Sequence, residues 1–170
     1  MLSEQMQKSL NEQVNAELFS SYLYLSMNAY FKSLNLDGFA NWMYVQAQEE
    51  LVHAMKFYDF INRRGGRVIL EKVEDPKKEW ASPLNAFEEA FEHEKMITGR
   101  IHHLVDISLQ ERDHATNTFL QWFVTEQVEE EESTDGVVRK LKLVGNADGG
   151  LFMIDLELAK RVFTAPSAQQ

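Results

Sequence analysis

Apolar residues recur every three to four positions over four long stretches of the chain, which is the spacing that places them on one face of an α-helix. In the first stretch the apolar stripe includes Leu10, Val14, Leu18, Tyr22 and Leu25. Segments rich in glycine, asparagine and aspartate separate the stretches and indicate where each helix stops. The pattern therefore predicts long helices over about residues 4–34, 39–64, 83–110 and 115–144.

Residues that commonly cap helices stand at two of the predicted starts. Ser3 can cap the first helix, and Ser82 followed by Pro83 is a typical opening for the third. The segment before that opening lacks helical rhythm, and "RVILEKV" at residues 67–73 has the local composition of a strand.

The C-terminal part of the chain is less regular. Gly145 is the expected stop of the fourth helix, inside which "STDG" at 133–136 predicts a kink. A short amphipathic helix is expected over about 151–162, and the tail, residues 163–170, is expected to be loose.

The lengths of the connections restrict how the helices can be arranged. "NLDG" joins the first two helices and "ERDHA" the third and fourth, so each pair should be antiparallel neighbours. Residues 65–82 form an 18-residue connector that spans at most about 59 Å, whereas the 26-residue second helix is about 39 Å long. The sequence therefore predicts one all-α domain over residues 1–170. It would be a four-helix bundle with one long crossover between helices 2 and 3 and a short C-terminal fifth helix.

Composition and charge narrow the classes of function. Hydrophobic residues make up 44% of the chain, enough for a core, and no run of them approaches the roughly 20 residues of a membrane span. Cysteine is absent, which excludes disulfides and thiolate metal sites. Together with a polar N-terminus unlike a signal or transit peptide, this favours a cytoplasmic location. The net charge of −10 argues against nucleic-acid binding and is compatible with metal cations as partners.

Several carboxylates occupy unusual positions in the helical pattern. Glu50 and His53 lie three residues apart on one helical face and can share one ion, although such a pair taken alone is more often an ordinary surface pair. Glu94 falls on the apolar face of the third helix, and Glu17 lies one turn after Val14 on the first. Each could snorkel to the surface, but a buried ionised carboxylate needs a cation or a shifted pKa.

A constant offset of 77 residues connects these polar positions. It leads from three positions in the first helical hairpin to three in the second, all with oxygen- or nitrogen-bearing side chains. The two sets are Glu17, Glu50 and His53, and Glu94, Gln127 and Glu130. Because the hairpins carry these groups in matching register, the bundle should bring them to one level. We interpret the set as a dinuclear metal site.

Over nearly its whole length the sequence resembles the bacterial non-haem ferritins, a family of ferritin-like four-helix bundles with a di-iron centre. The resemblance rests on "LNEQVNAELFSSYLYLSM", "QEELVHAMKF", "HEK", "FLQWFVTEQVEEEE" and "GLFMIDLEL". It implies that Glu17, Glu50 and His53 hold one iron, and that Glu50 bridges to a second iron held by Glu94 and Glu130. The side chains implied beside the pair are Gln127 and Tyr24.

The resemblance also implies a third iron site, formed by Glu49, Glu126, Glu129 and Glu130. Its last three members stand at i, i+3 and i+4, and therefore share one face of the fourth helix. The next acids of the run, Glu131 and Glu132, are expected to face solvent, because four consecutive helical residues cover about 300°. The histidines not expected to be ligands of this centre are His93, His102, His103 and His114.

The second copy of the Glu-x-x-His motif is Gln127-x-x-Glu130, so it lacks the imidazole. An amide oxygen is a poorer ligand for ferrous iron than imidazole, whereas carboxylates suit ferric iron. We therefore expect the second iron to leave after oxidation, which makes iron a substrate. The resemblance implies a ferroxidase that uses O₂ or peroxide, without haem. It also implies a homo-oligomeric shell of 24 subunits that stores ferric oxyhydroxide.

Three other interpretations stay open from the sequence. A haem-containing bacterioferritin would have a haem-ligating methionine on the second helix and a second Glu-x-x-His, but Leu51 and Val52 follow Glu50 here. A rubrerythrin-like peroxidase or other di-iron oxidase shares the bundle, although rubrerythrins add a cysteine-ligated iron that this chain cannot bind. The third is a non-catalytic structural bundle.

Overall fold

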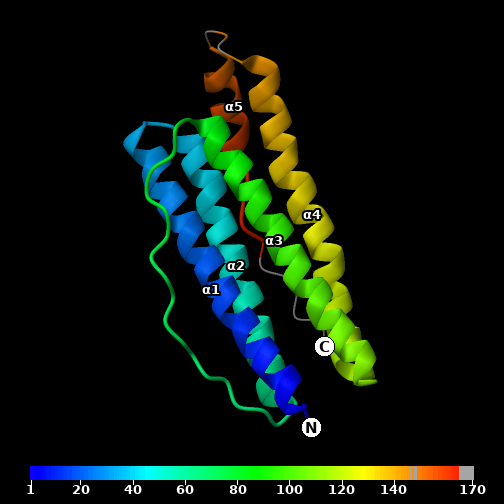
Figure 1. The fold of residues 1–170 in the computed structure, drawn as a ribbon. Coiled ribbons are helices and arrows are strands. Elements are labelled where there is room, and N and C mark those ends of the chain that lie inside the picture. Colours follow the sequence, from blue (N-terminus) through cyan, green and yellow to red (C-terminus); the bar gives the residue numbers. More distant parts are fainter. Residues whose placement is uncertain (146, 148, 165–170) are drawn as a thin grey trace.

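The computed structural model describes residues 1–145, 147 and 149–164, and in this part of the chain all regular secondary structure is helical (Figure 1). The helices are α1 (Glu4–Ser33), α2 (Asp37–Arg63), α3 (Pro83–Gln110), α4 (His114–Val144) and α5 (Gly150–Leu158). The first four form a bundle and α5 lies at one end of it, so the predicted all-α bundle with a crossover and a short fifth helix is confirmed. No helix among the described residues has both the length and the apolar character needed to cross a membrane.

Side chains cap three of the long helices. The hydroxyls of Ser3 and Ser82 accept hydrogen bonds from the first turns of α1 and α3, at 2.9 and 3.0 Å. The Asp113 carboxylate accepts a hydrogen bond from the Thr116 amide and so caps α4. This cap explains why α4 begins one residue earlier than expected. α4 continues through "STDG" without a break in the helix, and the kink expected there stays a prediction.

The C-terminal part departs from the expectation at one point. α5 ends at Leu158 rather than near residue 162, and Ala159 follows as its C-cap. Residues 163 and 164 of the expected loose tail are described without regular structure, and residues 165–170 lie outside the described part.

The core consists of two apolar clusters at different levels of the bundle. One contains Tyr24, Phe31, Ala47, Ala90 and Val137, and the other contains Val14, Phe57, Ile97, Leu120 and Phe123. About two to three turns separate the two clusters on α1, α2 and α3, and about four turns separate them on α4. The buried positions between the clusters are mainly polar. The polar layer between the clusters therefore has low-dielectric packing on both sides.

The expected apolar stripe of α1 is only partly correct. Leu10 and Val14 are buried, but Tyr22 and Leu25 are 48% and 41% exposed. Three successive steps of four residues, from 10 to 22, turn about 120° around a helix and leave the core face. The core face instead continues through Glu17, Ser20, Tyr24, Met27 and Phe31.

The connector between α2 and α3 runs along α1 on the outside of the bundle (Figure 1). Polar side chains of α1 hold its backbone: Asn11 accepts a hydrogen bond from the Ile69 amide at 2.7 Å, and Ser26 donates to the Lys77 carbonyl at 2.6 Å. "RVILEKV" forms no strand, because these side chains satisfy backbone groups that a neighbouring strand would otherwise pair.

α5 is attached to the start of α2. The Asp155 carboxylate accepts hydrogen bonds from the backbone amides of Gly38 and Phe39, at 2.8 and 3.0 Å. These amides have no partner within α2, whose own N-cap side chain makes no capping bond, so α5 supplies the cap. Gly38 permits the contact, since a Cβ there would lie 1.7 Å from the Asp155 carbonyl oxygen.

Candidate metal centre

All four long helices contribute to the polar layer. Glu17 comes from α1, Glu50 and His53 from α2, Glu94 from α3, and Gln127 and Glu130 from α4. Each of these side chains is at most 5% exposed. The 77-residue offset thus places matching positions of the two hairpins at one level of the bundle.

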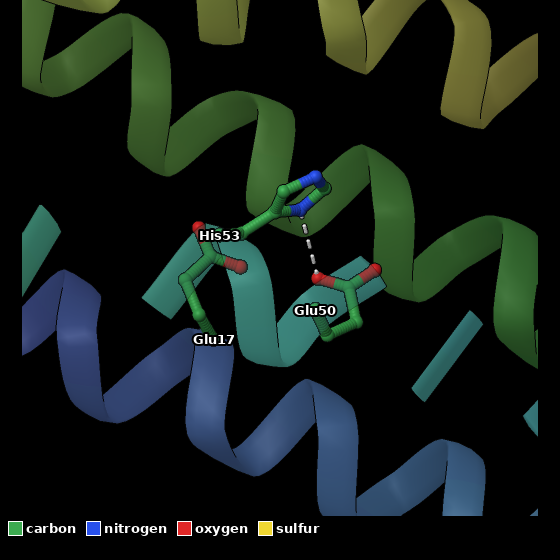
Figure 2. Close-up of side chains that lie close together, drawn as sticks. All are labelled: Glu17, Glu50 and His53. Carbon is green, nitrogen blue, oxygen red and sulfur yellow. Dashed lines mark hydrogen bonds and ion pairs between the residues drawn. The ribbon is translucent and has the colours of Figure 1, made fainter. Parts of the chain in front are cut away.

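Glu17, Glu50 and His53 converge on one small region between α1 and α2. Figure 2 shows Glu17 reaching from α1 toward the two residues on α2. One ligand atom from each residue lies within 4.8 Å of the others, close enough to share a metal ion. The His53 Nδ1 atom lies 3.3 Å from Glu50 Oε2, the contact drawn in Figure 2.

A second group of potential ligands shares the same imidazole. His53, Glu126 and Glu130 also place one ligand atom each within 4.8 Å of the others. In this group His53 Nε2 lies 3.7 Å from Glu126 Oε1. The imidazole therefore lies between two carboxylate groups, one on each side.

An unsatisfied oxygen indicates that the site is built for a cation. Glu17 Oε1 accepts a hydrogen bond from Gln13 at 2.7 Å, but Glu17 Oε2 is buried without a partner. A buried carboxylate oxygen in this state is costly unless it is protonated or bound to a cation. Two divalent ions would balance the charges of the four buried carboxylates at Glu17, Glu50, Glu94 and Glu130.

Burial changes the protonation of these acids. Burial and then repulsion from Glu50 raise the pKa of Glu17 to about 8, and the same two causes raise the pKa of Glu130 to about 8. Burial, Glu50 and Glu130 raise the pKa of Glu94 well above its ordinary value. Without a metal, these carboxyls retain protons at neutral pH.

Glu50 and His53 behave as an ion pair. Burial opposes the ionised form of Glu50, but His53 outweighs it and lowers the Glu50 pKa. Burial likewise opposes the charged imidazole, but Glu126 and Glu50 outweigh it and raise the pKa of His53 well above its usual range. In the absence of metal, the protonated imidazole of His53 therefore places a positive charge in the centre.

Tyr24 and Gln127 both interact with Glu94. The Tyr24 hydroxyl donates a hydrogen bond to Glu94 Oε1. Gln127 Nε2 lies 3.3 Å from Glu94 Oε2, and 3.3 Å from the Glu94 backbone carbonyl. The structure therefore brings both expected neighbours to the second half of the centre.

Two amides that orient carboxylates were not predicted from the sequence. Gln46 Nε2 donates to Glu50 Oε1 and to Glu130 Oε2, both at 2.8 Å, and Gln13 donates to Glu17. Each glutamine stands four residues before the glutamate on its own helix, so helical spacing could have identified it. The 77-residue offset leads from these glutamines to Ala90 and Phe123. The second hairpin therefore has no amide at these two positions, although Gln127 contacts Glu94 from another one.

His93 is also closer to the centre than expected. It is 9% exposed, and its Nε2 lies 2.7 Å from the Ser20 hydroxyl. Its ring meets the Tyr24 ring edge-on, with centroids 6.1 Å apart. Burial lowers its pKa, which favours the neutral imidazole, and the ring lies against Tyr24 and Ser20. The other histidines not expected to be ligands, His102, His103 and His114, are exposed.

The acids implied for a third site are only partly brought together. Glu126 and Glu130 share a group with His53, whereas Glu129 is exposed and Glu49 pairs with Arg161. The neighbouring acids differ: Glu132 is exposed, while half-buried Glu131 accepts a hydrogen bond from Thr98 at 2.6 Å. Glu131 therefore faces α3 rather than open solvent, contrary to the expectation.

Comparison with known proteins gives a consistent result. The family described as the ferritin-like domain matches residues 7–144. The bacterial non-heme ferritin of Bacteroides fragilis is 46% identical over 95% of this chain and 100% of its own length, and that of Campylobacter jejuni is 41% identical over 91% and 93%. An open pore ferritin from the archaeon Archaeoglobus fulgidus is 56% identical, with a TM-score of 0.94, covering 95% of this chain and 100% of its own.

The family match covers most of the chain, and the sequence relatives and the solved structure align along nearly all of it. The carboxylate and imidazole side chains described above lie within the matched range. The chain therefore belongs to the ferritin family.

Proposed function

We propose that this protein stores iron by oxidising ferrous ions at the centre between its four helices and holding the ferric product in a hollow assembly. One observation carries the proposal: four buried carboxylates and a buried imidazole lie in one polar layer of the bundle, where Glu17 Oε2 has no partner. Such a set costs folding stability unless protons or cations neutralise it. Membership of the ferritin family supports iron as that cation.

The donor set suits iron in both oxidation states. Imidazole and carboxylate together bind ferrous iron, and carboxylate oxygen favours the harder ferric ion. Two bound ferrous ions give one electron each to O₂, and with two protons the products are two ferric ions and hydrogen peroxide. Glu17, Glu94, Glu130 and His53 must release protons when the ferrous ions bind, because burial or pairing keeps them protonated without metal.

The two halves of the centre are chemically unequal, which favours release of iron. The first half has His53, and its Glu17 and Glu50 each accept a hydrogen bond from an amide. The second has Glu130 in the position that corresponds to His53, and Gln127, which corresponds to Glu50, directs its amide nitrogen at Glu94. A position that lacks imidazole binds ferrous iron less tightly. Iron at this centre is a substrate that moves on to storage.

Assembly and location complete the proposal. We propose a cytoplasmic shell of 24 identical subunits that encloses ferric oxyhydroxide, in keeping with membership of the ferritin family. The net charge of −10 per chain makes such a shell strongly anionic, and its potential would concentrate ferrous ions.

Aerobic loading of the purified assembly with ferrous salt tests the proposal. We expect a particle of the size of a 24-subunit shell, rapid oxygen consumption and an electron-dense core by microscopy. A protein that stays small, consumes no oxygen and forms no core would contradict it. A Soret band in the purified protein would instead indicate a haem-containing bacterioferritin.

A further inference from the structure

Arg161 contacts an acid beside the metal centre. Its Nη2 atom donates to Glu49 Oε2, and both side chains are about four-fifths buried, with exposures of 21% and 23%. Glu49 precedes the bridging residue Glu50 on α2, while Arg161 follows α5, 112 residues later in the chain. A guanidinium from the end of the fold thus lies next to the acids of the centre.

Several contacts hold Arg161 in this place. Its guanidinium carbon lies 4.2 Å from the centre of the Trp42 ring, and Nη1 lies 3.5 Å from the Trp42 backbone carbonyl. Its own backbone carbonyl accepts a hydrogen bond from Asn41 at 2.9 Å. The cation is therefore fixed to α2 before it meets Glu49, and its placement costs little further conformational entropy.

The position of α5 fixes the same arrangement from the other side. The Asp155 carboxylate caps α2, and Gly38 lets the two backbones approach closely. Arg161 follows six residues after Asp155, so this contact determines where its guanidinium can reach. The placement of Arg161 is thus a property of the whole α2–α5 junction.

The resemblance to ferritins implies a third iron site, and a metal ion there would compete with this guanidinium. The acids of that site are Glu49, Glu126, Glu129 and Glu130. Glu126, one of those acids, lies beside His53 and interacts electrostatically with Glu49. Guanidinium cannot lose its proton, so a metal ion that approaches Glu49 must either displace Arg161 from Oε2 or bind the other oxygen beside a fixed positive charge. The remaining acids are Glu130, already near the two-ion centre, and exposed Glu129.

We infer that Arg161 is a built-in cation that keeps Glu49 from a third metal ion and so limits the centre to two tightly bound ions per subunit. This inference rests on the proposed function, because it concerns the same group of acids. Arg161 is a positioning residue here, since it acts through Glu49 and does not bind the metal.

Titration of the assembled, iron-free protein with Zn²⁺ alone tests the inference, because Zn²⁺ binds similar ligands without redox chemistry. Wild-type protein should show two tight sites and a weak third one. In Arg161→Ala, the third site should tighten on the order of tenfold or more, the range expected when a charge-assisted hydrogen bond no longer competes. Arg161→Lys should restore much of the wild-type behaviour.

Two control variants separate this effect from general electrostatics. Lys160→Ala removes the same charge from the exposed neighbouring position and should leave the third site unchanged. Adding Glu49→Gln to Arg161→Ala should abolish the gain, because the freed ligand is then absent. A crystal of Arg161→Ala soaked in Zn²⁺ should show anomalous density beside Glu49 and Glu126.

The outcomes distinguish the two proposals. Equal third-site affinity in wild type and Arg161→Ala, or equal tightening in Lys160→Ala, would overturn the role of Arg161 and leave the two tight sites intact. Absence of the two tight sites in wild type would overturn the proposed function, and with it this inference.

Discussion

Gln46 Nε2 lies 2.8 Å from Glu130 Oε2, although the two residues are 84 positions apart in the chain. The same amide donates to Glu50 at 2.8 Å, so one nitrogen joins a carboxylate of α2 to one of α4. Gln46 is fully buried, and its carbonyl oxygen has no partner. The amide fixes one oxygen of each carboxylate and leaves the other oxygen available to a metal.

Replacing Gln46 by leucine tests this positioning role. Without the amide, Glu50 and Glu130 lose a shared donor, and we expect metal affinity of the two-ion centre to fall roughly 10- to 100-fold. Titration with Co²⁺, followed by its visible absorption, measures the affinity directly. Gln48→Leu on the same helix is the matched control, and equal behaviour of both variants would contradict the role.

Glu94 is expected to be needed for fast oxidation. It is the buried acid that α3 contributes to the polar layer, so Glu94→Ala should slow the aerobic oxidation of ferrous iron by at least about tenfold. Stopped-flow absorbance of the ferric product measures this rate. Exposed Glu92 provides the control, because Glu92→Ala removes an equal charge without touching the centre. Wild-type rates in Glu94→Ala would remove this residue from the centre.

Helical periodicity and spacing were sufficient to predict the bundle and the six polar residues that the 77-residue offset connects. The offset relates Glu17, Glu50 and His53 to the second hairpin because every long helix has the same rise and turn per residue. The number of residues along a helix therefore gives the height of a side chain along the bundle. A buried acid within an apolar face is also visible in sequence.

Contacts between distant elements were not predictable in the same way. The Arg161–Glu49 and Asp155–Gly38 contacts depend on where α5 docks, which no periodicity reports. "RVILEKV" was wrongly assigned strand character, because local composition says nothing about the α1 side chains that bind its backbone. Gln46 was missed because the 77-residue offset leads from it to an apolar residue. Only its spacing of four residues from Glu50 indicates that it contacts the centre.

The raised pKa values predict how stability without metal depends on pH. Glu17 and Glu130 have pKa values of about 8 in the folded protein, above the ordinary 4.5. The unfolded chain loses these protons at lower pH, so the stability that the neutral carboxyls contribute is complete below about pH 4.5 and is lost as pH rises toward 8. The melting temperature of iron-free protein should therefore fall from pH 6 to pH 8.

Two comparisons check that explanation. Glu17→Gln removes one of the titrating groups and should flatten the pH dependence of the melting temperature, while weakening metal binding. Added Zn²⁺ should raise the wild-type melting temperature more at pH 8 than at pH 6, because fewer protons must be displaced. A melting temperature that rises steadily to pH 8 without metal would contradict the assignment of protonated carboxyls to this centre.

The junction of α2 and α5 should be unusually sensitive to a single methyl group. In Gly38→Ala the new Cβ would lie 1.7 Å from the Asp155 carbonyl oxygen, so α5 must move or the junction must strain, at a cost of about 1–3 kcal/mol. We expect a lower melting temperature and faster proteolysis after α5, measured on the iron-free protein. Gly99 lies in α3 with nothing within 4 Å of an added Cβ, so Gly99→Ala should leave stability unchanged or raise it by up to about 1 kcal/mol. If Gly38→Ala matched Gly99→Ala in both measurements, the close approach of the two helices would not be what holds α5, and Arg161 with it, against α2.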